Sequence, residues 1–290
     1  MHSFKVAVIG LGAMGLPVAE NLGKKLAIQA WNRSPEIRCK NASGLISQVT
    51  DLKEVDAEII LTFLPDDVAV FETLKKGLLK SLQANDLLVV MGTVSPTAML
   101  AINVVVGERG ARAIDAPVSG GDAGAKSGEL SIMVGASRDD FLVIQPILAL
   151  IGKLVKHVGA LGSGQALKAC NQIIVGANLL AIAEALSLSR QFNIEDKDFF
   201  YVISNGLAGS TALNVKWEKL STSNFSQGGK SQYQLKDLRI ALAAAESLNF
   251  NLPLTQLLSE IFRKHVESGN SELDHSSIIL KYQEDTSDEN

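Results

Sequence analysis

The first half of the chain alternates short apolar runs with stretches in which apolar residues recur at helical spacing. Between residue 4 and about residue 160 the apolar runs are typical of strands, and the stretches between them, such as Leu16–Lys24 and Val68–Leu79, are typical of amphipathic helices. The predicted strands are Phe4–Ile9, Ala27–Trp31, Ile59–Phe63, Leu87–Met91, Ala113–Asp115 and Leu130–Val134. This alternation predicts right-handed βαβ units and therefore an α/β fold with a doubly wound, mostly parallel sheet.

After Gly164 the pattern becomes helical throughout. The stretch Gln165–Arg190 carries apolar residues at helical spacing, no proline and one internal glycine, so it predicts a long, largely buried helix. Further helices are predicted over Asp196–Asn205, Thr211–Leu220, Tyr233–Leu248 and Pro253–Ser268. We therefore predict two domains: an α/β domain over residues 1–161, and an all-helical domain over residues 162–290 that begins with the long helix.

Composition and charge narrow the classes of function. Hydrophobic residues make up 47% of the 290 residues, which is enough for a substantial core, and a formal net charge of −4 gives no broad electrostatic reason to bind nucleic acid or an acidic membrane. The longest apolar stretch, Ile173–Leu188, contains Asn178 and Glu184 and is too short to span a bilayer. Two cysteines cannot build a disulfide framework, and the four scattered histidines lack metal-ligand spacing. We expect a soluble, cytoplasmic protein with no metal site.

A glycine fingerprint follows the first predicted strand and opens the first predicted helix. Its residues are Gly10, Leu11, Gly12, Ala13, Met14 and Gly15. Glycines at this spacing permit a tight turn, a close backbone approach to a pyrophosphate and close helix–strand packing, while the helix N-terminus faces the phosphate charge. The context therefore predicts a Rossmann-type dinucleotide site.

The second predicted strand leads into Asn32, Arg33 and Ser34, where an NAD enzyme usually carries an acidic residue that accepts from the ribose 2′-hydroxyl. No carboxylate repels a 2′-phosphate here. Arg33 can pair with that phosphate, and Asn32 and Ser34 can donate hydrogen bonds to it. These residues favour NADP over NAD; the alternative is that Arg33 is an exposed loop charge.

A second glycine-rich segment lies at residues 115–135. Ser119, Gly120 and Gly121 follow a predicted strand, where backbone N–H groups can approach an anion, and a small carboxylate fits such a site. Gly124 and Gly128 would let the chain turn back into the strand Leu130–Val134. A tight hairpin without a ligand is the alternative.

Four motifs occur in order along the chain: the glycine fingerprint, the segment 115–135, the run from Gly162 to Gln172 that contains Lys168 and Asn171, and Lys236-Asp237-Leu238. Together they resemble the β-hydroxyacid dehydrogenase family, which includes 3-hydroxyisobutyrate dehydrogenases and tartronate semialdehyde reductases. The resemblance covers about residues 4–282.

The resemblance implies that Lys168 is the general acid/base. Gly164, Lys168, Asn171 and Gln172 share one helix face, and a lysine desolvated beside a nicotinamide has its charged form disfavoured. Without the other motifs, Lys168 would be a lysine that extends from a half-buried helix towards solvent.

The remaining site residues follow from the same resemblance. Ser119, Gly120 and Gly121 would hold the substrate carboxylate, Asn171 would orient the hydroxyl or Lys168, and Gln172 would contact substrate. Thr93 and Lys236 are expected near the nicotinamide, with Leu64 and Pro65 at the carboxyl end of a strand beside the cofactor. An ion pair between Lys236 and Asp237 is the alternative for that lysine.

Two departures from the family pattern bear on function. Met91-Gly92 precede Thr93 where the family more often has Asp-Ser, and Gln172 replaces a second asparagine. Asn171-Gln172 followed by two isoleucines, and Leu273-Asp274-His275-Ser276, resemble the tartronate semialdehyde reductase branch.

We therefore expect an NADP-dependent reductase of tartronate semialdehyde, associating as a homodimer or homotetramer through its second half. The alternatives are a succinic semialdehyde or glyoxylate reductase, a 3-hydroxyisobutyrate dehydrogenase, an imine reductase and a non-enzymatic dinucleotide-binding scaffold. Lys168 argues against the last two, since such relatives lack it.

Overall fold

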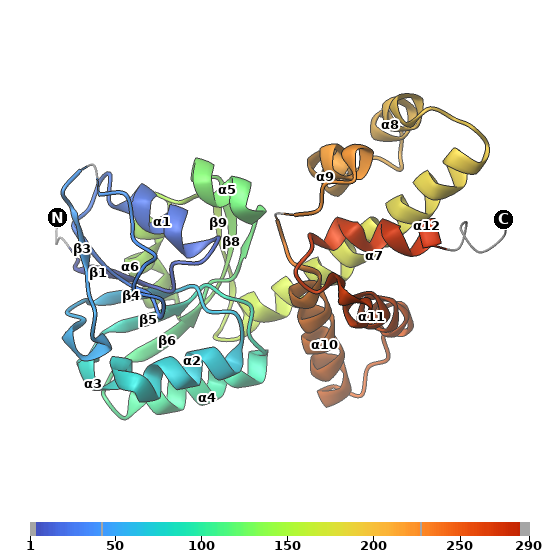
Figure 1. Cartoon of the computed structure of the whole chain (residues 1–290). Coiled ribbons are helices and arrows are strands. Elements are labelled where there is room, and N and C mark those ends of the chain that lie inside the picture. Colours follow the sequence, from blue (N-terminus) through green and yellow to red (C-terminus); the bar gives the residue numbers. More distant parts are fainter. Residues whose placement is uncertain (1–3, 42, 227, 285–290) are drawn as a thin grey trace. The chain divides into compact units, whose positions relative to one another are not determined.

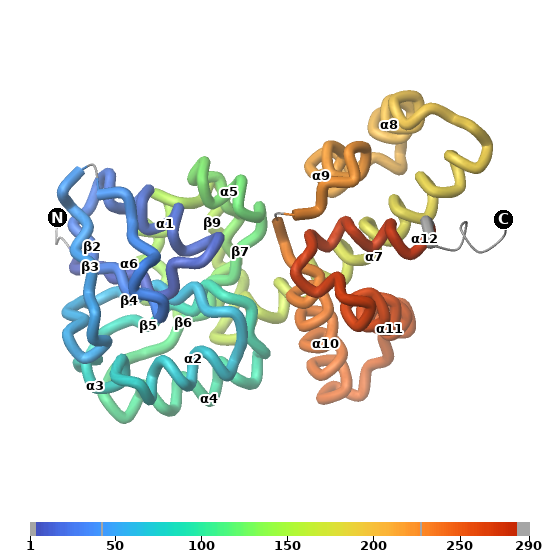
Figure 2. Tube along the Cα trace, viewed as in Figure 1, coloured from blue at the N-terminus to red at the C-terminus, as the bar shows by residue number. Residues whose placement is uncertain are grey.

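The computed structural model of the chain describes residues 4–41, 43–226 and 228–284 (Figures 1 and 2). It forms two compact units, the first ending at Lys168 and the second beginning at Ala169. The division therefore falls inside one long helix, α7 (Ser163–Gln191).

The first unit is built on one sheet in the order β3-β2-β1-β4-β5-β6-β8-β7, with β9 paired to β8. Its strands are β1 (Val6–Ile9), β2 (Ile28–Trp31), β3 (Ile46–Gln48), β4 (Ile59–Thr62), β5 (Leu87–Val90), β6 (Arg112–Asp115), β7 (Val118–Ser119), β8 (Leu130–Gly135) and β9 (Gly152–Gly159). The strands from β3 to β6 are parallel, whereas β8 runs antiparallel to β6 and β7. The predicted α/β fold with a doubly wound, mostly parallel sheet is confirmed.

Both faces of this sheet are covered. Val6 and Val8 of β1 belong to one apolar core, and Ala7 and Ile9 belong to the other. The first core is closed by α1 (Gly15–Leu22), α5 (Gly121–Ser127) and α6 (Arg138–Leu148), the second by α2 (Asp67–Thr73), α3 (Leu79–Ser81) and α4 (Pro96–Gly107) (Figure 1). Burial on both sides is why the central strands are continuous apolar runs in the sequence.

Several elements differ from the sequence-based expectation. The predicted helix Val68–Leu79 is interrupted by a π-helical turn over Leu74–Leu78, where Gly77 has non-helical dihedral angles. The segment after Gly120, expected to be a turn, contains the short helix α5. The strand β9 was not predicted, because its polar side chains, such as Lys153 and Lys156, leave no continuous apolar run.

The second unit is helical. It comprises most of α7, then α8 (Asp196–Asn205), α9 (Thr211–Thr222), α10 (Ser231–Ser247), α11 (Pro253–His265), a π-helical turn (Val266–Asn270), a 3₁₀ helix (His275–Leu280) and α12 (Lys281–Glu284). Its core packs Ala183 and Leu186 of α7 against Leu238, Leu258 and Phe262. The predicted C-terminal helical unit is confirmed.

Two features of the second unit bear on membranes and on partner chains. The helix α7 is long and apolar enough to cross a membrane, but one such helix is weak evidence for a membrane span. Its residues Leu179, Ala183 and Leu186 lie in the core of the unit. Phe192, Tyr201 and Leu207 are large apolar side chains that a single chain leaves exposed. Association through this unit stays a prediction.

Candidate active site

The glycine loop after β1 has the shape that a dinucleotide needs. A Cβ at Gly15 would collide with the carbonyl oxygen of Gly10, so the loop and the start of α1 touch backbone to backbone. Gly12 has no atom within 4 Å of its Cβ position, and the N-cap residue Met14 makes no side-chain cap hydrogen bond. Open space in front of an uncapped helix N-terminus fits a pyrophosphate.

Asn32 ties this loop to the end of β2. Its Oδ1 accepts from the backbone N–H of Leu11 at 2.9 Å, and its Nδ2 donates to the carbonyl oxygen of Ser34 at 3.1 Å. The amide therefore fixes two loops relative to each other. Contact between Asn32 or Ser34 and a 2′-phosphate remains a prediction.

A pocket of about 150 Å³ opens beside the end of β2. Its lining includes Trp31, Arg33, Arg38, Thr50 and Lys76. The Lys76 ammonium lies 5.5 Å from the centroid of the Trp31 ring, a cation–π arrangement that holds it over the pocket. Three basic side chains thus gather where a Rossmann fold binds the adenosine ribose, and the sequence pattern had singled out only Arg33.

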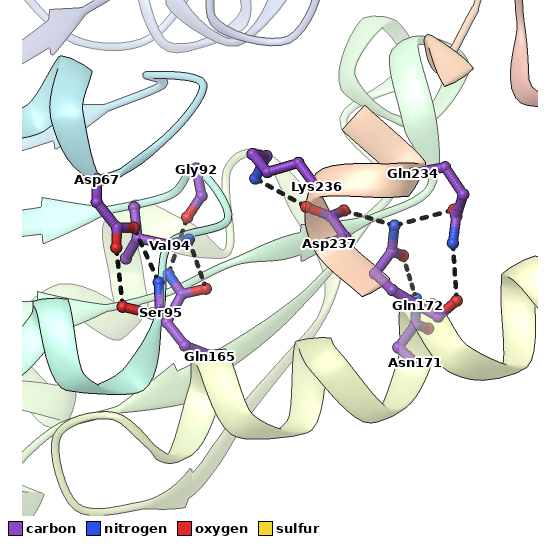
Figure 3. Close-up of polar contacts among 10 residues, drawn as sticks. All are labelled: Asp67, Gly92, Val94, Ser95, Gln165, Asn171, Gln172, Gln234, Lys236 and Asp237. Carbon is purple, nitrogen blue, oxygen red and sulfur yellow. Dashed lines mark hydrogen bonds and ion pairs between the residues drawn. The ribbon is translucent and has the colours of Figure 1, made fainter. Parts of the chain in front are cut away.

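The loops after β4 and β5 pack closely and are joined by hydrogen bonds. Leu64 and Pro65 follow β4, and a Cβ at Gly92 would collide with the Leu64 carbonyl oxygen, which explains a glycine before Thr93. Farther along, Asp67 accepts from the Ser95 backbone N–H at 2.9 Å and from its hydroxyl at 2.8 Å (Figure 3). Ser95 also caps α4, as its position before Pro96 predicts.

These loops all follow the carboxyl ends of neighbouring parallel strands, in the order β2, β1, β4 and β5. The structure therefore brings the glycine loop, Asn32–Ser34, Leu64-Pro65 and Thr93 to one edge of the sheet. This is the edge at which doubly wound sheets bind ligands.

Asp115 anchors the start of α7, a role that sequence reasoning missed. Its carboxylate is fully buried and accepts from the backbone N–H groups of Gly162 at 2.7 Å and Gln165 at 2.8 Å. Burial raises the pKa of Asp115, while these N–H donors oppose the rise by stabilising the charged form. The carboxylate compensates the positive end of the helix dipole. The sequence feature that could have indicated this role is an aspartate at the end of an apolar strand.

Lys168 lies one turn beyond this anchor. Although it is a lysine, the residue is only 8% exposed. A lysine is almost never fully buried unless its ammonium is paired. Its burial on an anchored helix fits an acid/base function.

Ser119, Gly120 and Gly121 form the predicted anion segment. Ser119 ends β7 opposite Ser131 of β8, and Gly120 and Gly121 have φ values of 124° and 61°, which favour glycine. No atom lies within 4 Å of the Cβ position of Gly121, so its backbone is open to a small ligand.

In the helical unit, a chain of polar contacts joins α7 to α10 (Figure 3). Asn171 Nδ2 donates to Gln172 Oε1 at 2.8 Å, and Gln172 Nε2 donates to Asp237 Oδ2 at 2.7 Å. Asp237 Oδ1 lies 2.8 Å from the Lys236 ammonium. The ion pair between Lys236 and Asp237, which was the alternative drawn from the sequence, is therefore present, and its carboxylate is buried. A contact between Lys236 and the cofactor stays a prediction.

Comparisons with known proteins agree with this architecture. A family model described as the NAD binding domain of 6-phosphogluconate dehydrogenase matches residues 5–159. A second, described as NAD-binding of NADP-dependent 3-hydroxyisobutyrate dehydrogenase, matches residues 162–282. The 2-hydroxy-3-oxopropionate reductase of Escherichia coli is 35% identical over 95% of this chain and 96% of its own length.

The chain belongs to the β-hydroxyacid dehydrogenase family. A second relative, the 2-(hydroxymethyl)glutarate dehydrogenase of Eubacterium barkeri, is 35% identical over 98% of this chain and 96% of its own length. The 3-hydroxyisobutyrate dehydrogenase of Mycobacterium tuberculosis, whose structure was determined with L-serine, superposes with a TM-score of 0.82 at 26% identity, covering 97% of this chain and 99% of its own.

This β-hydroxyacid dehydrogenase is thus an NAD(P)-dependent oxidoreductase that acts on hydroxyl groups. Within residues 4–41, 43–226 and 228–284, no three metal-ligating side chains gather, so the dehydrogenase has no candidate metal centre there.

Proposed function

We propose that this dehydrogenase reduces tartronate semialdehyde to its 3-hydroxyacid with NADPH, and runs the reverse oxidation at the same site. The observation that carries the proposal is the buried Lys168 on the helix anchored by Asp115. The choice of substrate is supported by the Escherichia coli relative, whose name gives 2-hydroxy-3-oxopropionate, that is tartronate semialdehyde. The choice of NADPH is supported by Arg33, Arg38 and Lys76 around one pocket, and by Asn32, which stands directly after β2 where an NAD enzyme usually has an acidic residue.

Each site residue has a role in this proposal. NADPH held by the glycine loop would supply the hydride that reduces the aldehyde carbon. The Lys168 ammonium donates a proton to the carbonyl oxygen, so that aldehyde, hydride and proton together give the alcohol. Ser119 and the backbone of Gly120 and Gly121 bind the substrate carboxylate, and Asn171 orients the reacting oxygen.

Screening substrates by NADPH absorbance tests this function. The purified protein is assayed with tartronate semialdehyde, succinic semialdehyde, glyoxylate and methylmalonate semialdehyde, and kcat/KM is compared. We expect turnover of these carboxylate-bearing carbonyl compounds, with the highest kcat/KM for tartronate semialdehyde. Another preferred acid would transfer the proposal to that acid, whereas NADPH binding without any turnover would favour the scaffold function.

A further inference from the structure

Gln165 holds the backbone on both sides of Thr93. Its Nε2 donates to the Gly92 carbonyl oxygen at 2.8 Å, and its Oε1 accepts from the Val94 N–H at 3.2 Å (Figure 3). The residue is fully buried. One side-chain amide thus satisfies a buried donor and a buried acceptor of the same loop. Breaking either hydrogen bond would leave a buried polar group unsatisfied and destabilise the folded protein.

Gln165 is itself held in place. Its backbone N–H donates to Asp115 Oδ2, so the residue sits at the anchored start of α7. Lys168 lies three residues farther along the same helix and on the same side. The loop at Thr93 and the helix that carries Lys168 therefore share one rigid connection.

We propose that Gln165 is a positioning residue that sets Thr93 against the nicotinamide end of the cofactor and keeps this loop in register with Lys168. The inference rests on the proposed function for the place of the nicotinamide. It predicts that damage at Gln165 affects the nicotinamide half of NADPH and spares the adenosine half, which lies at the end of β2.

The Gln165→Glu variant tests this without changing the volume of the side chain. A charged glutamate can still accept from Val94 but places an oxygen against the Gly92 carbonyl oxygen, whereas a protonated glutamate donates there and restores both bonds. The charged or titratable groups around it are Asp115, Asp67 through Ser95, and Lys168 on α7. The two carboxylates and the burial of the site favour the protonated glutamate, whereas the Lys168 ammonium opposes it.

The measurement is the affinity of the purified protein for NADPH and for 2′,5′-ADP, by calorimetry, between pH 6 and pH 8.5. Using the ratio of the two affinities cancels the titration of the 2′-phosphate. For Gln165→Glu we expect roughly tenfold weaker NADPH binding at high pH, recovery towards pH 6, and unchanged 2′,5′-ADP binding. The exposed Gln145→Glu carries the same charge change and should leave the ratio at the wild-type value.

Gln165→Met is the second variant, since it keeps the length of the side chain and removes both hydrogen bonds. It should weaken NADPH selectively at every pH, without recovery. Equal losses for NADPH and 2′,5′-ADP, or no loss in folded variants, would overturn the proposal. If the binding pattern holds while no semialdehyde is reduced, the positioning role stands and the proposed substrate fails.

Discussion

Gln172 donates from its side-chain amide to the buried carboxylate of Asp237, with 2.7 Å between Nε2 and Oδ2. The same amide accepts from Asn171, and Asp237 pairs with Lys236. Gln172 thus connects a residue expected to orient the substrate with a lysine expected near the cofactor.

Replacing Gln172 by leucine should destabilise the protein by about 1–3 kcal/mol, because it leaves a buried carboxylate oxygen without this donor. Chemical denaturation measures the change. Gln256→Leu, at an exposed glutamine of the same unit, is the control and should change the free energy of unfolding by less than about 0.5 kcal/mol. Equal effects of the two substitutions would show that the hydrogen bond between Gln172 and Asp237 does not stabilise the protein.

Removing the guanidinium of Arg33 should weaken NADPH roughly 10- to 100-fold and NADH only slightly, because a charged hydrogen bond to the 2′-phosphate is lost. Lys76→Ala should act in the same direction, since Lys76 lines the same pocket. Fluorescence titration with both cofactors measures this, with exposed Arg109→Ala as the charge-matched control. Parallel losses for NADPH and NADH would remove the basis for cofactor choice.

Truncating Ser119 to alanine should raise the KM for the semialdehyde about tenfold, because one hydrogen bond to a charged carboxylate disappears. Steady-state kinetics at saturating NADPH measures KM and kcat. Ser131→Ala, opposite it on β8, is the matched control. If Ser119→Ala instead weakens only NADPH, the segment belongs to the cofactor site.

Acidification should destabilise the helical unit through His265. Burial lowers the pKa of His265 from 6.5 to about 4, and its Nε2 lies 2.7 Å from the Ser277 hydroxyl. Because the folded state resists protonation, stability is complete above pH 6.5 and falls as the pH drops from 6.5 to 4, by up to about 3 kcal/mol. Comparing urea unfolding of wild type and His265→Gln across this range isolates the effect; identical pH profiles would contradict it.

Much of the fold follows from local pattern. The central strands are buried on both faces, so they are continuous apolar runs, and the glycine fingerprint occurs directly after the first of them. Edge elements carry a weaker signal: β3 has three residues, and β9 is partly exposed. The helix α5 was not predicted because its two glycines and its three other small residues, Ala123, Ala125 and Ser127, are typical of a turn.

The long-range polar contacts of the site could not be predicted. Asp115 and Gln165 are far apart in sequence, and nothing local shows that one caps the helix of the other. The pairing of Gln172 with Asp237 is equally non-local. Resemblance supplied Lys168 and Asn171, but the side chains that hold the site together depend on how strands and helices pack.

The Lys168→Ala variant, assayed for turnover and for NADPH affinity in the same preparation, tests whether this amine is the general acid/base. As a general acid/base, Lys168 should contribute about 100- to 10,000-fold to kcat, and NADPH affinity should stay nearly unchanged. Substantial remaining turnover together with a large loss of NADPH affinity would contradict the assignment of the chemistry to this amine.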